Sequence, residues 1–252
     1  MNLKRAFRVW QRNATVYKKL YRSSLTLNFF EPMLYLVALG YGLGGFIKEI
    51  MGMTYIEFIA PGIVMSSAMF AACYECTYGT YVRMVYQKTF DAVLATPISF
   101  SELVLGELLW GTTKSLIYGT IIILVISLFG LIKSYFAIFL IPLIILCGLI
   151  FASLSLIATA IVPGIDSFNY FYTLVLTPIF LFSGIFFPVE DMPEVVVKLS
   201  QINPLVHFVN ISRAFSYGKI TQTLIYDLTI VIVYLIVLLP LPFILLKRRY
   251  LL

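Results

Sequence analysis

The sequence predicts an all-α integral membrane protein built from six transmembrane helices. Of its 252 residues, 61% are hydrophobic and only 12% are charged, and the mean hydropathy is +0.97. A soluble protein carries roughly a quarter charged residues to cover its surface, whereas here the charges gather near the two ends and in a few short gaps. Six separate segments reach the length of about 20 apolar residues that a helix needs to cross a bilayer. This composition excludes a soluble enzyme.

The six expected spans are assigned by their apolar length. They cover residues 26–47, 58–80, 103–129, 135–162, 168–188 and 224–246. The whole chain, 1–252, is then a single transmembrane domain, with an interfacial helix in 1–25, the six spans within 26–246 and a short tail in 247–252. More than half of the chain lies in the bilayer, which leaves no room for a separate soluble domain.

The distribution of Lys and Arg predicts the orientation. If the N-terminus lies inside, the inner segments hold twelve of the 18 basic residues and the outer segments hold five. Because positive residues accumulate on the cytoplasmic side of membrane proteins, we expect both termini to be cytoplasmic. The net charge of +6 is accordingly a topology signal, and we expect no nucleic-acid partner.

The first 25 residues have the pattern of a helix that lies on the membrane surface. Apolar residues recur at spacings of three and four, and seven basic residues occupy the remaining positions. The apolar face consists of Leu3, Phe7, Trp10, Ala14, Tyr17 and Tyr21. Such a helix either only anchors the chain to anionic lipid of the bilayer or also contacts a cytoplasmic partner.

The inner connection between the second and third spans, 81–101, is long for a hairpin between membrane helices. Residues 84–95 have a composition compatible with a helix, which Thr96 and Pro97 would end. We therefore expect a short helix across the cytoplasmic end of the bundle. Its polar members, which face either water or a protein partner, are Gln87, Lys88, Thr89 and Asp91.

The outer stretch 189–223 is too short for two more spans and too apolar for a free aqueous loop. Two half-helices that dip into the outer leaflet fit this length. Re-entrant backbone has to pack against protein or line a wet cavity, because unpaired amides are costly in lipid. We expect this region to be the outer gate. The residues assigned to the gate are Phe187, Pro188, Pro193, Pro204 and His207.

Five ionisable residues fall within the expected spans, where such groups are rare and suggest a function. They are Glu31, Glu75, Glu107, Lys114 and Asp227. Glu107 and Lys114 are seven residues apart and share a helix face, and Glu75 lies at a similar depth in the neighbouring span. We expect these three to cluster near the cytoplasmic side, as a structural ion pair, which is the favoured role, or as the lining of a substrate path. Glu31 and Asp227 lie near span ends, where water makes a charge less costly.

Several apparent motifs predict no chemistry. The run from Gly106 to Ser115 resembles a phosphate-binding loop, but its lysine follows the second glycine by three places and no strand precedes it. Cys73 and Cys76 lie in an apolar stretch and are expected to be ordinary buried thiols. The single His207 has no ligand-type neighbour at metal-binding spacing. We expect no catalytic residue, metal or cofactor on this chain.

Six motifs occur along nearly the whole chain. They are EPMLYLVALGYGLG at 31–44, FIAPGIVMSSAM at 58–69, TFDAVLATP at 89–97, ELVLGELLWG at 102–111, TPIFLFSGIFFP at 177–188 and NPLVHF at 203–208. In combination and in this order, they resemble the type-two ABC exporter permeases, the ABC-2 type transporters. Within that family the chain is most similar to the NodJ-like branch, which exports lipo-oligosaccharide nodulation factors.

The resemblance implies six spans, cytoplasmic ends and a bacterial or archaeal cytoplasmic membrane. It also implies a transporter made of two permease copies, a homodimer in the simplest case, and two copies of a separate ATPase subunit that binds ATP and Mg²⁺. The outer half-helices at 189–215 correspond to the re-entrant cap of the family, and the turn 162–168 corresponds to a second, smaller cytoplasmic contact.

The resemblance further implies that the segment 87–97 is the coupling helix, which docks into the ATPase. Its coupling residues are then Gln87, Lys88, Thr89, Phe90, Asp91, Leu94, Thr96 and Pro97. Asp91 stands where many members have an acidic residue shortly before an aliphatic pair. Lys88 departs from the family pattern, because the wider family commonly has glycine there.

The function implied by the resemblance is ATP-driven export of an amphiphile such as a lipo-oligosaccharide or glycolipid, so that the chain itself is no enzyme. The alternative is an ion-coupled secondary carrier or channel that uses Glu75, Glu107 and Lys114 as a relay. Carriers of that kind often contain internal repeats, which this sequence lacks. A membrane-embedded enzyme would need a nucleophile with a base, a paired acid or a metal cluster, and the expected spans hold none of these.

Overall fold

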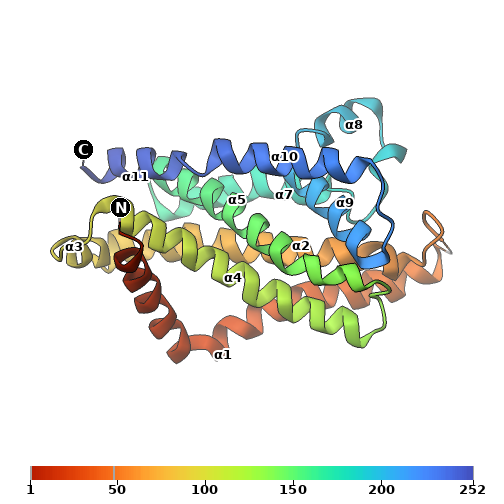
Figure 1. Cartoon of the computed structure of the whole chain (residues 1–252), viewed down its shortest axis with the longest axis horizontal. Coiled ribbons are helices and arrows are strands. Elements are labelled where there is room, and N and C mark those ends of the chain that lie inside the picture. Colours follow the sequence, from red (N-terminus) through yellow and green to blue (C-terminus); the bar gives the residue numbers. More distant parts are fainter. Residues whose placement is uncertain (1, 48, 252) are drawn as a thin grey trace.

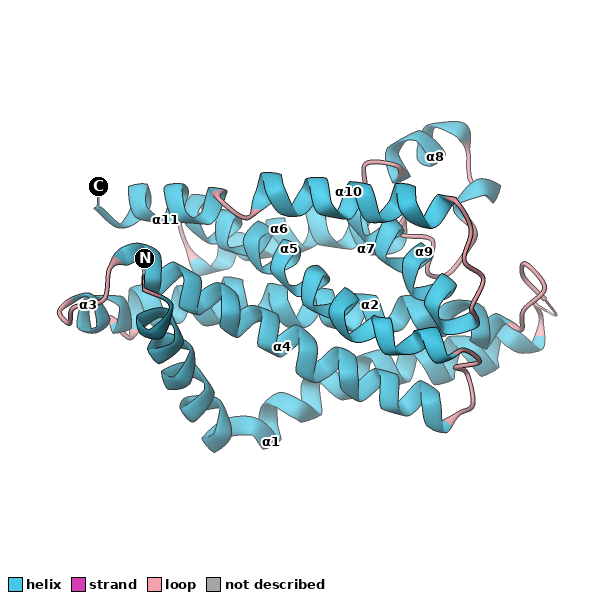
Figure 2. Ribbon diagram, viewed as in Figure 1, coloured by secondary structure: helices cyan, strands magenta, loops and turns pink. Residues whose placement is uncertain are grey.

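The computed structural model describes residues 2–47 and 49–251, without the side chains of residues 20, 22–29, 31 and 251. The expected intramembrane Glu31 therefore lies outside the described side chains. Every regular element among the described residues is helical, which confirms the all-α prediction for them (Figure 2). The α-helices are α1 (Leu3–Gly42), α2 (Tyr55–Tyr74), α3 (Thr89–Leu94), α4 (Phe100–Leu128), α5 (Leu140–Ile161), α6 (Phe168–Phe171), α7 (Thr177–Leu181), α8 (Glu194–Ser200), α9 (Pro204–Tyr217), α10 (Thr223–Leu238) and α11 (Leu241–Leu251).

Four helices in the described part of the chain are long and apolar enough to cross a membrane. They are Tyr55–Tyr86, Phe100–Leu128, Tyr135–Ile161 and Thr223–Tyr250, and they match the expected spans at 58–80, 103–129, 135–162 and 224–246. Two π-helical turns continue α2: Glu75–Gly79 lies within the predicted span, and Val82–Tyr86 lies beyond its predicted end at residue 80. At the other end of the sequence, α11 continues as helix into the segment expected to be a short tail.

The expected spans at 26–47 and 168–188 have a different form. The helix α1 runs from Leu3 to Gly42, so it joins the predicted interfacial helix and the predicted first span without a break. Figure 1 shows that α1 nevertheless bends sharply between its dark-red N-terminal part and the orange part that joins the bundle.

The expected span at 168–188 is helical only as far as Leu181, and residues 182–188 form a turn in which Gly184 takes a φ of +74°. The prediction of a helix to 188 is therefore wrong, because the chain turns at this glycine.

The helix α2 forms the centre of the bundle and packs against α1, α4, α5 and α9. Close approach depends on small residues. A Cβ atom on Gly111 of α4 would lie 2.3 Å from the Cys76 Sγ atom, and a Cβ on Gly148 of α5 would lie 2.9 Å from the Ser115 side chain. Cys73 and Cys76 are buried free thiols, as predicted. Their role is in the packing of α2 against its neighbours.

The two ends of the bundle differ in what they carry. Both chain termini and α3 lie at one end, whereas α8, α9 and the loop after α1 lie toward the other (Figure 1). The inner connection and the outer stretch that the sequence predicts are thus placed at opposite ends. The expected pair of outer helices is present as α8 and α9, and only α9 is largely buried in the bundle.

Candidate functional site

The helix α3 is a short element at the end of the bundle that also holds both termini. Its Phe90 side chain is 1% exposed and fixes α3 to the bundle, and Thr89 and Leu94 are partly buried. The exposed residues of this region are Gln87, Lys88, Asp91, Ala92, Ala95, Thr96 and Pro97, of which only Asp91 and Ala92 belong to α3 itself. The α3 helix and the residues that flank it thus expose a mixed polar and small surface, while an aromatic side chain anchors the helix.

The expected helix over 84–95 is wrong in extent. Residues 82–86 continue the preceding long helix, and α3 begins only at Thr89. Between them Lys88 has a φ of 51° and a ψ of 28°, the left-handed conformation. That conformation costs a residue with a Cβ atom free energy that glycine avoids, so it breaks the helix at this point. A glycine at this position would adopt this conformation without the same cost.

Both ends of the chain hold α3 in place. From α1, the Arg12 Nη2 atom donates a hydrogen bond of 3.1 Å to the Thr89 Oγ1 atom. From α11, the Tyr250 hydroxyl donates to the Asp91 carboxylate, and the Tyr250 and Phe90 rings lie 6.1 Å apart between centroids. Asp91, which the family resemblance assigns to partner contact, is therefore also bonded within its own chain.

The structure brings the three expected intramembrane charges together, and a fourth residue joins them. The Arg83 Nη1 atom lies 2.6 Å from the Glu75 Oε1 atom, and its Nη2 atom lies 2.5 Å from the Glu107 Oε2 atom. The Lys114 Nζ atom lies 3.5 Å from the Glu75 Oε2 atom. The sequence interpretation counted Arg83 only as a topology charge, and its spacing of eight residues from Glu75 is not one at which helical side chains normally pair. The two π-helical turns Glu75–Gly79 and Val82–Tyr86 lie in this stretch.

The N-terminal helix completes this charge cluster. The Asn13 Nδ2 atom donates a hydrogen bond of 2.8 Å to the Glu107 Oε1 atom, and the Thr80 hydroxyl donates a hydrogen bond of 2.8 Å to the Glu107 Oε2 atom. The Lys114 Nζ atom lies 3.8 Å from the centre of the Tyr17 ring. A buried carboxylate is stable only when its oxygens are paired. Both oxygens of Glu107 are paired, one with Asn13 and the other with Thr80 and Arg83.

The first part of α1 docks on α4 through only part of the predicted apolar face. From that face, the Trp10 Nε1 atom donates a hydrogen bond of 2.8 Å to the Thr113 Oγ1 atom of α4, and the Tyr17 and Trp110 ring centroids lie 5.6 Å apart. Leu3 and Phe7 of that face are 69% and 47% exposed, and the buried residues are instead Ala6, Val9 and Asn13. The fit depends on Gly106, because a Cβ atom there would lie 2.5 Å from the Val9 Cβ atom. Small side chains thus allow α1 to approach α4, and a count of large apolar residues could not reveal this contact.

At the opposite end, Arg213 of α9 fastens the turn after α7 to the start of α2. Its Nε atom donates a hydrogen bond of 3.1 Å to the Phe58 carbonyl oxygen, and its Nη2 atom donates one of 2.6 Å to the Gly184 carbonyl oxygen. Its guanidinium group also lies 3.7 Å from the centre of the Phe58 ring. Burial lowers the pKa of Arg213 to about 10. Tyr217, which like Arg213 belongs to α9, donates a hydrogen bond of 2.7 Å from its hydroxyl to the Glu57 carbonyl oxygen.

His207 has a partner that the sequence analysis missed. Its Nδ1 atom lies 2.6 Å from the Asp227 Oδ1 atom, and its Nε2 atom lies 3.1 Å from the Gln201 carbonyl. Both side chains of the pair are buried, so Asp227 is not left to water at a span end as expected. Asp227 and His207 are 20 residues apart, and only the return of α10 beside α9 brings them together. The pair links the two helices.

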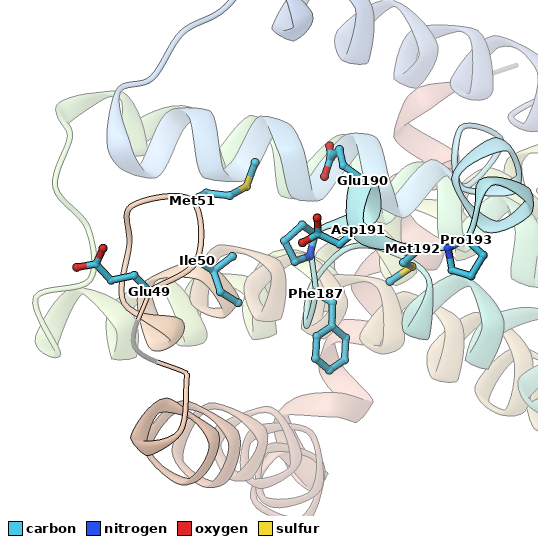
Figure 3. A pocket seen from close by; sticks show the side chains of 9 residues that line it. Glu49, Ile50, Met51, Phe187, Glu190, Asp191, Met192 and Pro193 are labelled. Carbon is cyan, nitrogen blue, oxygen red and sulfur yellow. The ribbon is translucent and has the colours of Figure 1, made fainter.

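Three of the expected gate residues, Phe187, Pro188 and Pro193, line an outer cavity of about 610 Å³ (Figure 3). Figure 3 shows Glu190 and Asp191 on the short segment after Phe187, with the loop that carries Glu49 and Ile50 beside it. His207 and Pro188 line a neighbouring cavity of about 680 Å³. Pro204 lines neither of these cavities; it is the first residue of α9 and is buried.

Aromatic rings form a continuous series along α2 and the α6–α7 segment. The ring centroids of Tyr74 and Tyr172 are 4.9 Å apart, those of Phe70 and Phe180 are 5.3 Å apart, and Tyr35 of α1 lies 5.9 Å from Phe180. Tyr35 and Tyr74 are 39% and 42% exposed. This aromatic face, composed of Tyr35, Phe70, Tyr74, Tyr172 and Phe180, is thus open on one side.

Comparison with known proteins identifies the family. The ABC-2 type transporter family matches residues 4–217. The chain is 39% identical over 205 residues to Nodulation protein J of Sinorhizobium fredii, covering 81% of this chain and 78% of that protein. It is 36% identical over 243 residues to Nodulation protein J of Rhizobium leguminosarum bv. trifolii, covering 96% and 93%. It is 22% identical over 210 residues to the inner membrane transport permease YadH of Escherichia coli, covering 83% and 80%.

The match spans most of the described helices, and the four long apolar helices give the chain the form of a multi-pass membrane protein. The family consists of membrane transport subunits. The chain therefore belongs to the ABC-2 type transporter family of membrane permeases.

Proposed function

We propose that the chain is the membrane-spanning subunit of an ATP-driven exporter in a bacterial or archaeal cytoplasmic membrane. One observation carries the proposal: at the end of the bundle that holds both termini, Asp91 of α3 and the flanking Gln87 and Lys88 are exposed, while Phe90 anchors the helix. A helix so placed is suited to receive force from a soluble partner. The name of the YadH relative, an inner membrane transport permease, supports the location.

In this proposal the chain crosses the membrane six times with both termini cytoplasmic. In Figure 1 the orange part of α1 runs lengthwise from the bend toward the end of the bundle that carries α8, as a membrane span would. Two copies of the chain, as a homodimer, surround a central path and bind two ATPase subunits. ATP and Mg²⁺ bind to those subunits, and their closure acts on the region 87–97.

The substrate in this proposal is an amphiphile such as a lipo-oligosaccharide or glycolipid, moved outward. The similarity to proteins named Nodulation protein J favours this class. The aromatic face fits it physically, because exposed rings can stack on sugar rings and also contact acyl chains. The outer cavities near Phe187 and His207 would lie at the exit of the path.

A second candidate is an ion-coupled carrier, favoured by the ionisable cluster in the membrane helices. Its proposed relay residues Glu75 and Glu107 are both bonded to Arg83. A relay requires groups that release and regain protons or ions, and these pairs would have to break in each cycle. Ion-dependent flux in vesicles that contain no ATPase would support the carrier.

The exporter proposal is tested by purification from native membranes. A tagged chain is extracted in mild detergent, its bound proteins are identified by mass spectrometry, and ATP hydrolysis is measured. We expect an ABC ATPase subunit in equimolar amount, with ATP turnover that is absent from the permease alone. A chain that purifies without such a subunit in several detergents, and without ATP turnover, would contradict the proposal.

A further inference from the structure

A cavity of about 400 Å³ lies between the first part of α1, the π-helical end of α2 and the start of α4. Its charged lining residues are Arg12, Glu75, Arg83 and Lys114, and aromatic side chains of Tyr17 and Trp110 complete one side. Arg12, Asn13, Val16 and Tyr17 of α1 line the cavity, and the exposed positions of the same part of α1 carry the basic residues Lys4, Arg5, Arg8, Lys18 and Lys19.

The charges around this cavity do not balance. Three cations, Arg12, Arg83 and Lys114, face two carboxylates, those of Glu75 and Glu107. Arg83 bonds to both carboxylates and Lys114 lies beside Glu75, so each carboxylate already has a cation. One positive charge is therefore in excess.

The excess charge resides on Arg12. Its two hydrogen-bond acceptors are the neutral oxygens of Asn13 and Thr89, at 3.0 and 3.1 Å. It forms no ion pair with any carboxylate in the described part of the chain. Burial and repulsion by Arg83 lower its pKa below the usual value, which agrees with a site of surplus positive potential. Guanidinium groups stay charged even so and bind phosphate in a planar, two-pronged geometry.

We propose that this cavity binds a phosphate-bearing anion at the cytoplasmic surface, either the headgroup of an anionic membrane lipid or free phosphate, with Arg12 as its principal contact. Lys114 and the Trp110 and Tyr17 rings form the remaining wall for the ligand. The basic part of α1 that lines the cavity would attract anionic lipid to this place. The proposal does not depend on the ATPase or on the transported substrate.

The chain supplies its own probe for a test. It has only two tryptophans: Trp110 lines the cavity, and the Trp10 ring lies against Trp110, with the two ring centroids 6.4 Å apart. Tryptophan emission of the purified chain in maltoside micelles is followed during titration with phosphatidylglycerol, phosphatidylcholine, inorganic phosphate or potassium chloride. We expect a saturable change with phosphatidylglycerol and none with phosphatidylcholine or chloride. Saturation by phosphate that displaces the lipid response would identify the free anion as ligand, and its failure would identify the headgroup.

Variants separate a defined site from diffuse surface charge. Arg12→Gln should weaken phosphatidylglycerol binding about tenfold, and Arg12→Lys should stay within about threefold of the original. Arg8→Gln removes the same charge one turn away on an exposed part of α1 and should weaken binding clearly less than Arg12→Gln does, because Arg8 does not line the cavity. Lys114→Gln provides a second lining variant if Arg12→Gln does not fold, as judged by circular dichroism. Equal responses to both lipids, or equal weakening by Arg8→Gln and by the lining variant, would overturn the proposal.

Discussion

The Tyr250 hydroxyl, close to the C-terminus, donates a hydrogen bond to the Asp91 Oδ1 atom of α3. Tyr250→Phe removes this donor and keeps the ring contact with Phe90. Because a bond to a charged group contributes about 1–2 kcal/mol, α3 should be less firmly held. We expect ATP-driven export in reconstituted vesicles to fall roughly three- to tenfold, with normal membrane insertion.

The matched control is Tyr135→Phe, since the Tyr135 side chain is fully exposed near the opposite end of the bundle. It should export as the original protein does. Normal export by Tyr250→Phe, or an equal loss in both variants, would show that the Tyr250–Asp91 bond does not position α3.

Arg83 is predicted to be the most sensitive residue of the charge cluster. Arg83→Gln leaves the buried Glu107 carboxylate without its cation, and breaking such a pair costs roughly 3–5 kcal/mol. We expect a clear fall in the melting temperature measured by circular dichroism in detergent. The double variant with Glu107→Gln should recover part of the loss, because it removes the unpaired charge. If Arg83→Gln has the same melting temperature as the original protein, the cluster does not have the structural role assigned to it.

Lys88 offers a test of the backbone at the start of α3. Lys88→Gly should stabilise α3 by about 0.5–1 kcal/mol, because glycine adopts the observed positive φ without steric cost. Lys88→Val should have the opposite effect, since a β-branched residue is least tolerated there. Hydrogen exchange of the α3 amides measures the difference, and faster exchange in the glycine variant than in the valine variant would refute the assigned conformation.

Gly106 should be intolerant of even one added methyl group. Its Cβ atom in Gly106→Ala would lie 2.5 Å from the Val9 Cβ and 2.9 Å from the Ala6 carbonyl oxygen. Such overpacking costs about 1–3 kcal/mol and should displace the first part of α1. Trypsin should then cleave α1 faster at its basic residues. Gly42→Ala is the control, because open space surrounds that glycine, and equal cleavage of both variants would argue against the docking of α1 on α4.

The sequence predicted the long helices well, because apolar length is a local property that 20 residues express by themselves. It failed where conformation depends on single residues. The left-handed Lys88 and the turn at Gly184 carry no periodic signal, so the short helix was placed too early and the span at 168–188 was extended too far. The single helix α1 was divided in two because its composition changes along it; the helix stays continuous from Leu3 to Gly42, although it bends sharply between its two parts.

The candidate site was predicted in part for a similar reason. Glu107 and Lys114 share a helix face, so their spacing places them together, and Glu75 follows from depth in the membrane. Asn13 and Glu107, which are hydrogen-bonded, are 94 residues apart in the sequence, and Asp227 and His207 are 20 residues apart. Such contacts are decided by tertiary packing, which a single sequence does not display.

The central claim is that the region around α3 meets an ATPase on the cytoplasmic side. The natural cysteines Cys73, Cys76 and Cys147 are buried, so an introduced exposed cysteine can be labelled selectively. Thr96→Cys, beside α3, is compared with Lys198→Cys in α8 at the opposite end; both side chains are exposed. Each variant is treated with a short thiol cross-linker in membranes that contain the assembled transporter.

We predict that Thr96→Cys cross-links to the ATPase subunit and resists an impermeant thiol reagent added outside intact cells. Lys198→Cys should show the reverse behaviour, with labelling from outside and no cross-link. A cross-link from position 198, or labelling of both positions from the same side of the membrane, would contradict the account.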